Sequence, residues 1–374
     1  MAFDISVGPN LRKSPYFDAT VADGVQGFSI YNHMYLPTHF GNPEQEYRRL
    51  VEGVAMWDVA AQRQVELQGP DAAKLLDYLS ARNLANTRVG QGRYVPICNH
   101  DGLLINDPVM LPLAEDHFWL SIADSDIELW AGAIAAERGL DVAVREADAS
   151  PLAIQGPHAT ELAEKLFGGW IRELRYFAFK ATELDGIPLV LARSGWSKQG
   201  GFELYLQDGS RGNELWERVK QAGAAFDIGP GAPNDAERVE SGLVSYGADA
   251  RLQVNPANPF ELGLGKLIDL DDDRDFVGKA ALTRIRNDGI KRTLVGFYVE
   301  GARLAGNQHS LPVTCQGATV GYISEVAWSP RLEQNIAMGL LATSLDDSAA
   351  LQANFGGDTR ELKATTLPFL PPKT

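Results

Sequence analysis

A strand–turn–helix pattern occurs twice in this chain and constrains its fold more than any other feature. The first copy reads Val-Glu-Leu-Gln-Gly-Pro at residues 65–70, and the second reads Leu-Ala-Ile-Gln-Gly-Pro at 152–157. In both, apolar residues indicate a strand and the proline stands where an amphipathic helix should begin. The repeat predicts two related α+β units. The alternative is that a common strand-to-helix turn recurs by chance.

The composition is that of an ordinary globular protein. The 374 residues, of which 45% are hydrophobic and 22% charged, suffice for two or three domains with a large core. A net charge of −15 argues against nucleic acid and against an anionic membrane surface as partners, because both require a basic face. We therefore expect small-molecule partners. The sequence leaves a homodimer open.

Cofactor motifs are absent from the sequence. The six histidines lack the spacing of metal ligands, so no metal is expected. No Gly-x-Gly-x-x-Gly lies between a strand and a helix, which argues against nicotinamide chemistry. The two cysteines, Cys98 and Cys315, lie far apart in a chain without an apolar leader or a run of eighteen apolar residues. These features predict a cytoplasmic protein with reduced thiols.

The glycine-rich stretch 192–206, Ala-Arg-Ser-Gly-Trp-Ser-Lys-Gln-Gly-Gly-Phe-Glu-Leu-Tyr-Leu, is the strongest candidate for a binding site. A phosphate cradle is excluded because the glycines precede an alternating strand and not a helix. A nucleophile elbow is excluded because Gln199 stands where its closing glycine is required. What is left is a bare backbone that a flat ligand can approach, followed by Glu203 and Tyr205 on one face of a strand.

The second half of the chain contains one further predicted helix and then mostly short predicted strands. A capping box at 234–237 predicts a helix that continues to about Tyr246 and ends at Gly247. The acidic run 269–275 is interpreted as a solvated connection. Beyond Lys291, short strands such as 294–299 and 319–323 alternate with turns, which predicts a separate β-rich domain. The proline-rich tail 367–372 is expected to lie along the surface.

Several motifs occur in the order found in the glycine-cleavage T-protein family, the tetrahydrofolate-dependent aminomethyl and methyl transferases. They are the two Gln-Gly-Pro strands, the segments 94–107 and 237–247, Gly-Gly-Phe-Glu-Leu-Tyr at 200–205, and Asn-Pro-Phe-Glu-Leu-Gly-Leu-Gly at 258–265. The match covers about 31–339. Tyr-Asn-His-Met at 31–34 and the 194–203 loop most resemble the dimethylsulfoniopropionate demethylase branch. The aryl-ether O-demethylases share the 31–34 element but are longer.

The resemblance implies an α+β fold of three domains in a cloverleaf around a central folate channel. The first domain would comprise residues 1–50 and 150–255 and would hold folate and donor, and the second would comprise 51–149. The third, 256–374, would be β-rich and barrel- or jelly-roll-like. A flavin dehydrogenase with a T-protein module needs an additional nucleotide-binding domain, for which the chain has no room, so no flavin is expected.

The resemblance also assigns the folate site. The pterin ring presents an amide N–H beside an exocyclic amine, and the Glu203 carboxylate can accept from both. The glycines before Glu203 would leave room for the ring. The same channel would be lined by Tyr94, Ser121, Phe177 and Tyr205. The alternatives are an exposed strand carboxylate for Glu203, and plain core aromatics for Tyr94 and Phe177.

Asp107 stands where the family carries an acidic residue facing the reacting folate nitrogen. A carboxylate there can stabilise the transient positive charge, take up the proton and orient the lone pair. Asn-Asp-Pro at 106–108 is also a strong turn signal, which is the structural alternative.

A sulfonium methyl donor leaves as a neutral thioether, so in-line displacement needs alignment and the exclusion of water but no general acid. Aromatic faces would hold the cation. The candidates for this cage are Tyr31, Trp170 and Trp196, each of which can instead be a packing aromatic, and His33 or Lys198 could bind the donor carboxylate.

Two anionic substrates require a local basic patch in this acidic chain. Lys198, Arg238 and Arg331 are its predicted members, although Arg238 can instead form an ion pair on its own helix. The resulting hypothesis is a redox-neutral, tetrahydrofolate-dependent demethylase of dimethylsulfoniopropionate. The alternatives are an O- or N-demethylase of another small donor and a folate-binding protein without transferase activity.

Overall fold

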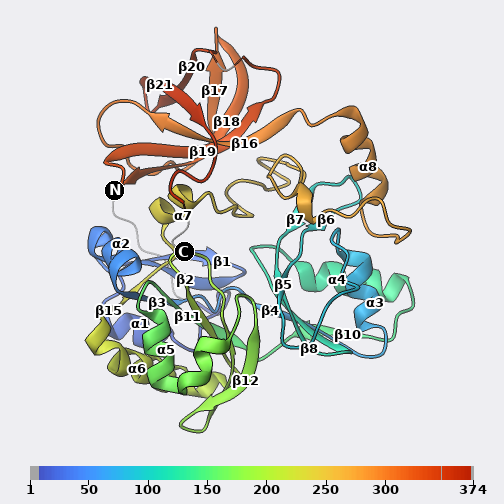
Figure 1. The fold of residues 1–374 in the computed structure, drawn as a ribbon, viewed down its shortest axis with the longest axis vertical. Helices are drawn as coiled ribbons and strands as arrows, with labels where there is room; N and C mark the ends of the chain where they lie inside the picture. The colour runs from blue at the N-terminus through green and yellow to red at the C-terminus, as the bar shows by residue number, and fades with distance from the viewer. Residues whose placement is uncertain (1–7, 347, 372–374) are drawn as a thin grey trace.

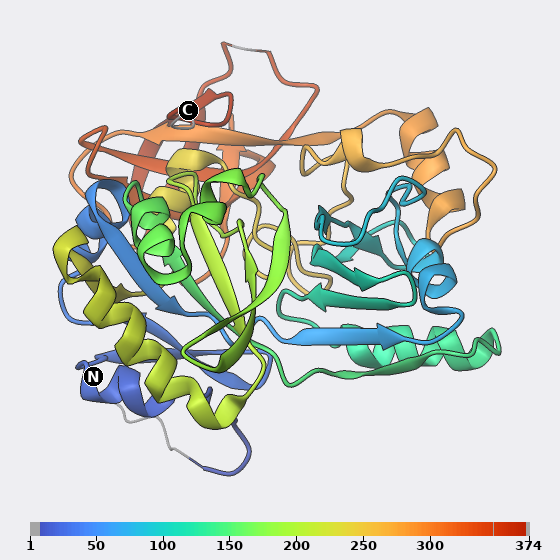
Figure 2. The ribbon, with the colours of Figure 1, turned by 60° about the horizontal axis from the view of Figure 1, so that its bottom comes forward.

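The computed structural model describes residues 8–346 and 348–371. Figure 1 shows three lobes: a β-barrel at the top and two lobes of mixed helix and sheet side by side below it. In the turned view of Figure 2, the long yellow-green helix of the N-terminal lobe, Gly212–Gly223, lies in front of that lobe's sheet. The predicted α+β class with a β-rich C-terminal domain is confirmed, and that domain is a closed barrel.

The first lobe is built on a six-stranded sheet. In spatial order its strands are β12 (Phe179–Leu184), β13 (Ile187–Ala192), β14 (Gly201–Leu206), β11 (Ser150–Gln155), β3 (Val54–Asp58) and β15 (Ile228–Gly231). Around it lie α1 (Phe17–Ala22), α2 (Pro43–Glu52), α5 (Ala159–Phe167), α6 (Gly212–Gly223) and the short turns η1 (Gly169–Glu173), η2 (Gly209–Arg211) and η3 (Ala224–Phe226). The apolar stripes of α5 and α6 share one core with β11, in which Leu162, Trp216 and Ile154 are fully buried.

The second lobe has a five-stranded sheet. In spatial order its strands are β10 (Ala143–Glu146), β4 (Gln64–Gln68), β9 (His117–Ser121), β8 (Val109–Ala114) and β5 (Arg93–Tyr94). Its other elements are α3 (Ala72–Leu79), α4 (Ile127–Glu137) and the small pair β6 (Ile97–Cys98) and β7 (Leu104–Asn106). The same strand order occurs in both lobes. β8, β9 and β4 are neighbours in the second sheet, just as β13, β14 and β11 are neighbours in the first.

The two Gln-Gly-Pro turns have the same conformation, which confirms the predicted strand–turn–helix repeat. Gly69 and Gly156 have φ of +142° and +136°, and each accepts a 3.0 Å hydrogen bond from the amide three residues later. A Cβ at Gly69 would lie 2.8 Å from the carbonyl oxygen of Asp141, so only glycine fits this turn. The helices begin two residues after the prolines, at Ala72 and Ala159.

The Tyr-Asn-His-Met element is a tight hairpin. Strands β1 (Gly27–Tyr31) and β2 (Met34–His39) pair with Tyr31 opposite Met34, so Asn32 and His33 alone form the turn. Both have left-handed backbones, with φ of +48° and +60°, as a two-residue hairpin turn of this type requires. Asn32 fixes the hairpin to the second lobe because its Nδ2 donates to the carbonyl oxygens of Ala61 (3.0 Å) and Ala123 (3.1 Å).

The C-terminal lobe is a closed six-stranded barrel. Around the barrel its strands are β16 (Arg292–Val299), β19 (Gln334–Ala342), β18 (Ala318–Ser329), β17 (Leu311–Cys315), β20 (Leu351–Phe355) and β21 (Asp358–Thr365). Three shorter elements lead into it, namely α7 (Asp235–Ser241), η4 (Gly265–Leu267) and α8 (Lys279–Asp288). Of the predicted tail, residues 367–371 are described, and Phe369 packs edge-on against Tyr298 with ring centroids 5.1 Å apart.

The helix predicted from 234 to 246 is shorter than expected. Its start is correct, since Asn234 caps it by accepting from the Glu237 amide at 3.0 Å. Its predicted end is wrong: α7 stops at Ser241 because Gly242 adopts a left-handed backbone with φ of +62°. This glycine therefore ends the helix before Gly247 is reached.

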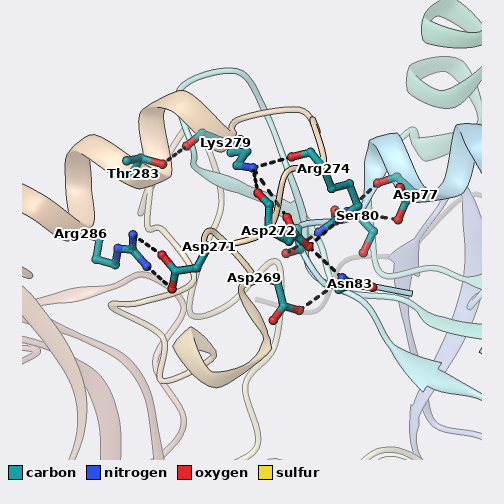
Figure 3. Close-up of polar contacts among 11 residues, drawn as sticks. Asp77, Ser80, Asn83, Asp269, Asp271, Asp272, Arg274, Lys279, Thr283 and Arg286 are labelled. Carbon is teal, nitrogen blue, oxygen red and sulfur yellow. Dashed lines mark hydrogen bonds and ion pairs between the residues drawn. The ribbon is translucent and has the colours of Figure 1, made fainter. Parts of the chain in front are cut away.

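The acidic run 269–275 is exposed at Asp269, Asp271, Asp273 and Asp275, as a solvated connection would be, but it is also held against the second lobe. Figure 3 shows it docked against the end of α3. Arg274 Nη1 donates to the carbonyl oxygens of Asp77 (2.8 Å) and Ser80 (2.7 Å), and Asp272 accepts from the Asn83 side chain at 2.8 Å. The cations thus neutralise the acidic side chains and satisfy helix-end carbonyls that would otherwise lack partners.

The predicted second domain begins at residue 51 and so includes β3. In the structure, however, β3 pairs with β11 and β15 in the sheet of the first lobe. Residues 256–291 precede the barrel strands, and Leu282 of α8 packs with Cys98 and Ala81 of the second lobe. We therefore propose domain limits near residue 60 and near residue 291. None of the helices in the described residues is long and apolar enough to span a membrane.

Candidate active site

Glu203 lies in the interior, on the side of β14 that faces the second lobe. Its side chain points away from solvent and the residue is only 6% exposed. Oε2 accepts hydrogen bonds from the Ser194 hydroxyl and from the Tyr205 hydroxyl, the latter at 3.2 Å. Tyr205 continues the contact across the lobes, since its ring lies 6.4 Å from that of Trp119 on β9. The exposed-strand alternative for Glu203 is therefore wrong.

The Glu203 carboxylate has no cationic partner among the described residues. Burial raises its pKa above the ordinary value, while the bonds from Ser194 and Tyr205 act in the opposite direction. Both bonds go to Oε2, and no described residue donates to Oε1. A buried carboxylate with a free oxygen is arranged to receive N–H donors from a ligand.

The glycines before Glu203 have a different role from the predicted one. A Cβ at Gly195 or Gly201 would collide with the side chain of Gln155, which fills the space inside the loop. Gln155 Nε2 donates to the carbonyl oxygen of Ser194 (3.1 Å), and its Oε1 accepts from the hydroxyl of Ser197 (2.8 Å). The expectation that these glycines make room for a ring is wrong, because a side chain from β11 already occupies that room.

The other side of the loop is fixed to α7. Glu237 is buried, and its Oε1 accepts from the Lys198 amide (3.0 Å) and from the Gln199 side chain (2.9 Å). The loop between Ser194 and Gly201 is thus anchored at both flanks by buried side chains. This holds Ser194 where it donates to Glu203.

We predict that Gly201→Ala destabilises the protein far more than Gly200→Ala. A Cβ at residue 201 would collide with the backbone carbonyl oxygen of Ile154, whereas a Cβ at residue 200 meets nothing within 4 Å. Both glycines have positive φ, so the conformational cost of about 1 kcal/mol is common to both. The added clash should cost about 1–3 kcal/mol more in urea unfolding. Equal losses in the two variants would contradict the close packing of Gly201 against Ile154 and Gln155.

Asp107 and Tyr94 form the second part of the site. The Tyr94 hydroxyl donates to Asp107 Oδ2 at 2.6 Å. Burial raises the pKa of the Asp107 carboxyl group to about 6, the bond from Tyr94 lowers it, and the charge of Asp249 raises it. No described lysine or arginine forms an ion pair with Asp107, so its charge is available to a ligand.

The β1–β2 hairpin brings Tyr31 to the same place. Burial raises the pKa of the Tyr31 phenol, and the charges of Asp107 and Asp124 raise it further. Tyr246 is only 5% exposed, and the charges of the same two carboxylates raise the pKa of its phenol. Tyr94 thus contacts Asp107 directly, and the Tyr31 and Tyr246 phenols lie within range of its charge.

The other predicted folate residues lie around these carboxylates. Ser121, at the end of β9, accepts from Gln64 Nε2 at 3.1 Å, and its hydroxyl lowers the pKa of Tyr205. Phe177 has a left-handed backbone with φ of +62°, and its carbonyl oxygen accepts from the Gly92 amide at 2.7 Å, next to β5. The structure therefore connects Ser121 directly to the Glu203 cluster and places Phe177 beside the strand of Tyr94.

The predicted donor residues are more dispersed. Trp196 is half-buried, with the Arg238 guanidinium 5.9 Å from its ring. Trp170 lies in η1 after α5, and Lys180 Nζ is 4.6 Å from its ring. His33 is exposed at the hairpin turn, 3.6 Å from Asp126, and the Lys198 side chain is exposed. Among the described residues, no ring–ring contact joins Trp170 to Trp196 or Tyr31, so the three-membered cage stays a proposal.

The predicted basic patch is wrong for two of its members. Arg238 is 1% exposed and pairs with Asp249 at 2.8 Å and with Glu325 at 3.4 Å. Arg331 pairs with the buried Glu240, and its Nε donates a further hydrogen bond to the Tyr47 hydroxyl oxygen at 2.8 Å. Since both charges are neutralised internally, neither is available to an anionic substrate.

The structure also adds residues that the sequence did not indicate. These are Gln155, Ser194, Glu237, Tyr246 and Asp249. The repeat itself held a usable signal for Gln155, because a glutamine precedes Gly-Pro in both copies. Asp249 is fully buried and accepts from the Ser324 hydroxyl of the barrel at 2.5 Å, a long-range contact without a local signal.

A cavity of about 830 Å³ lies elsewhere. Residues of both sheets line it, among them Glu66, Arg145 and Lys180. Within residues 8–346 and 348–371, no three His, Cys, Asp or Glu side chains are grouped to hold a metal ion.

Comparisons with known proteins agree with this architecture. Residues 16–272 match the model of the GCVT N-terminal domain, and residues 292–370 match that of the glycine cleavage T-protein C-terminal barrel domain. The chain is 41% identical over 334 residues to the dimethylsulfoniopropionate demethylase DmdA of Ruegeria pomeroyi, covering 89% of this chain and 90% of that protein. It is 30% identical over 337 residues to an aminomethyltransferase of Desulfitobacterium hafniense, covering 88% and 90%.

A solved structure gives the same result for the fold. The glycine cleavage system aminomethyltransferase T of Bartonella henselae superposes with a TM-score of 0.84 at 20% identity, covering 97% of this chain and 99% of that one. At this identity the superposition concerns the fold alone.

Proposed function

The chain belongs to the glycine cleavage T-protein family, and on this premise we propose that it transfers a methyl group from dimethylsulfoniopropionate to N5 of tetrahydrofolate. Its relatives use tetrahydrofolate as cosubstrate. The products are methylthiopropionate and 5-methyltetrahydrofolate, and no electrons are exchanged with a redox partner. The observation that carries the proposal is the pair of interior carboxylates, Glu203 and Asp107, neither of which forms an ion pair within the described residues.

The residues present fit a reduced pterin. Glu203 offers Oε1 and the remaining lone pairs of Oε2 to the adjacent N–H donors at the ring edge, and the Ser194 and Tyr205 hydroxyls fix its orientation. Ser121 and Tyr94 extend the polar lining towards Asp107. Tetrahydrofolate would supply the nucleophilic nitrogen.

Asp107 acts on the charge that develops at that nitrogen. When the methyl carbon bonds to N5, the electrons of the C–S bond stay on sulfur and the nitrogen becomes cationic. The Asp107 carboxylate stabilises this cation and then accepts its proton, directly or through water. The Tyr94 hydroxyl holds the carboxylate in place.

The charge around Asp107 favours a cationic donor. The charges of Asp107 and Asp124 both raise the pKa of Tyr31. Asp124 accepts a hydrogen bond from the Asn32 amide at 2.8 Å, and among the described residues its one cationic partner is Arg251, at 3.8 Å. A sulfonium group is attracted by these carboxylates and by aromatic faces, and it leaves as a neutral thioether. A phenolate leaving group would be repelled by the same charges.

The direct test is to incubate the purified protein with tetrahydrofolate and one methyl donor at a time. The donors would be dimethylsulfoniopropionate, a methoxy-aromatic acid and an N-methylated amine, with products measured by mass spectrometry. We expect methylthiopropionate and 5-methyltetrahydrofolate from the sulfonium. Turnover of another donor alone would replace the assigned substrate, and the absence of turnover with retained folate binding would favour a non-catalytic folate-binding protein.

We predict that Trp196→Ala raises the KM for the sulfonium and leaves folate affinity unchanged. A cation–π contact of about 0.5–2 kcal/mol corresponds to a rise of about 2- to 30-fold. Trp196→Phe is the control, because it keeps an aromatic face and should recover most of the loss. An equal fall in folate affinity would show that Trp196 shapes the loop next to Glu203 and does not contact the donor.

A further inference from the structure

Another cavity lies where the chain crosses between the first and second lobes. The connection 59–63 runs from β3 to β4, and the connection 147–149 returns from β10 to β11. The two lie side by side, because the Ala147 amide donates to the carbonyl oxygen of Gln64 at 2.9 Å. Residues of 12–15, 60–63 and 146–150 and Met34 line a cavity of about 420 Å³, which we name the crossover cavity. A volume of this size is sufficient for a small molecule.

Positive charge is in excess in the crossover cavity. Its charged lining residues are three cations and two carboxylates, namely Arg12, Lys13, Arg63, Glu146 and Asp148. Glu146 divides its charge between two guanidinium groups, since Oε1 accepts from Arg12 at 2.8 Å and Oε2 from Arg63 at 3.2 Å. The ion pair of Lys13 with Asp18 spans 4.0 Å, and both side chains are exposed. In a chain with a net charge of −15, such a local excess of cations attracts an anion.

Arg63 has a hydrogen-bond donor to spare in this cavity. Its side chain is 12% exposed, and Nη1 donates to Glu146. Nε is shielded from solvent and has no hydrogen-bond partner among the described residues. The Nε and Nη2 side of a guanidinium binds a planar carboxylate through two parallel hydrogen bonds. Because a buried donor without an acceptor destabilises the fold, a ligand that supplies an oxygen to Nε binds favourably.

The remaining lining residues indicate which kind of anion fits. The apolar ones are Pro15, Met34 and Ala60, of which Met34 and Ala60 are buried. The carboxylates of Glu146 and Asp148 repel a second negative charge, which disfavours phosphate and other dianions. A short aliphatic monocarboxylate meets both conditions, because it has a single charge for Arg63 and a carbon chain for the apolar surface.

The crossover cavity is also joined to the hairpin that carries Tyr31. The Arg12 amide donates to the carbonyl oxygen of His33 (2.9 Å), and the Tyr35 amide donates to that of Arg12 (3.0 Å). Met34, which lines the cavity, is paired with Tyr31 across the hairpin. An anion that restrains Arg12 and Met34 therefore also stabilises the hairpin at its turn.

We propose that the crossover cavity binds a small aliphatic monocarboxylate at Arg63, and that the bound anion stabilises the β1–β2 hairpin. Neither Glu203 nor Asp107 lines this cavity, so the site is separate from the proposed folate site. The inference goes beyond the proposed function and does not depend on it.

The test uses sodium propionate as the probe, with sodium chloride at the same ionic strength as the reference. Binding is measured as the rise in thermal midpoint, and its place is measured by hydrogen–deuterium exchange of the peptide 31–36. The variants are Arg63→Gln and Asp148→Asn. The matched control for the second is Asp273→Asn, because both aspartates are exposed and neither forms a hydrogen bond or ion pair within the described residues.

For the wild type we expect a dissociation constant of about 1 mM, so that 20 mM propionate raises the midpoint by about 2–4 °C. Exchange at 31–36 should slow, since the Tyr35 amide is bonded to Arg12. Arg63→Gln should lose both effects. Asp148→Asn should bind propionate about threefold more tightly than the wild type, because one repelling charge is removed, and Asp273→Asn should not.

Three results would overturn the inference. They are unchanged exchange at 31–36 in the wild type, propionate binding that survives in Arg63→Gln, and equal affinities of Asp148→Asn and Asp273→Asn. The last comparison decides the matter even if Arg63→Gln fails to fold, because it predicts a gain of affinity in a folded protein. Tighter binding of phosphate than of propionate by the wild type would likewise refute the assigned class of ligand.

Discussion

Replacing Glu203 by Gln is expected to lower the affinity for tetrahydrofolate by at least about 100-fold. The substitution keeps the size of the side chain but puts an amide N–H₂ where the ligand presents its own donors. Two hydrogen bonds to a charged group, at about 1.5–3 kcal/mol each, are lost or weakened. Anaerobic calorimetry with tetrahydrofolate measures the effect, and Glu183→Gln is the control because that carboxylate is exposed on β12 of the same sheet.

The stability of Glu203→Gln should not fall with its affinity. Burial raises the pKa of Glu203, so between its unfolded and folded pKa values the native state binds more protons and the free energy of unfolding decreases as pH rises. At neutral pH the ionised carboxylate is therefore a cost to the fold that the amide removes. We therefore expect Glu203→Gln to unfold at or above the thermal midpoint of the wild type while losing its affinity for tetrahydrofolate. Retained affinity for tetrahydrofolate would refute the pterin assignment.

Asp107→Asn is expected to lower turnover by about 100-fold without a matching loss of folate affinity. The amide cannot neutralise the cationic nitrogen or accept its proton, and general acid–base contributions are about 10²- to 10⁴-fold. In the wild type, turnover should rise with pH through about 6, the pKa to which burial raises Asp107, because the ionised form is the active one. The variant should lack this ascending limb.

Tyr94→Phe separates the role of the carboxylate from general damage to the site. The hydrogen bond from Tyr94 lowers the pKa of Asp107, so its removal should move the ascending limb to higher pH and leave turnover at high pH largely intact. The measurement is the initial rate of methylthiopropionate release between pH 5 and 9. If the rate of this variant rises with pH over the same range as in the wild type, a group other than Asp107 controls the rate.

The features that the sequence predicts well are those determined within a few residues. The Gln-Gly-Pro repeat, the Asn234 cap and the barrel strands follow from turn residues and apolar alternation, which local geometry enforces. The pterin-binding role of Glu203 was inferred from its family motif. Its burial was not predicted, since alternation alone cannot say which face of a strand is covered.

The errors concern partners that are distant along the chain. Arg238 was expected to serve a substrate or its own helix, but its acids are Asp249 and Glu325, the latter 87 residues away. Gly195 and Gly201 were interpreted without knowledge that Gln155 packs between them.

The docking of Arg274 onto the end of α3 limits how this protein can be dissected. The helix belongs to the second lobe, whereas the guanidinium that satisfies its final carbonyls comes from almost 200 residues further along, with separations of 197 and 194 for Asp77 and Ser80. Expressing the second lobe alone would leave those oxygens and the apolar surface beneath Leu282 open to water. Isolated fragments should therefore aggregate, and work on separate parts of the enzyme will need the intact polypeptide carrying point substitutions.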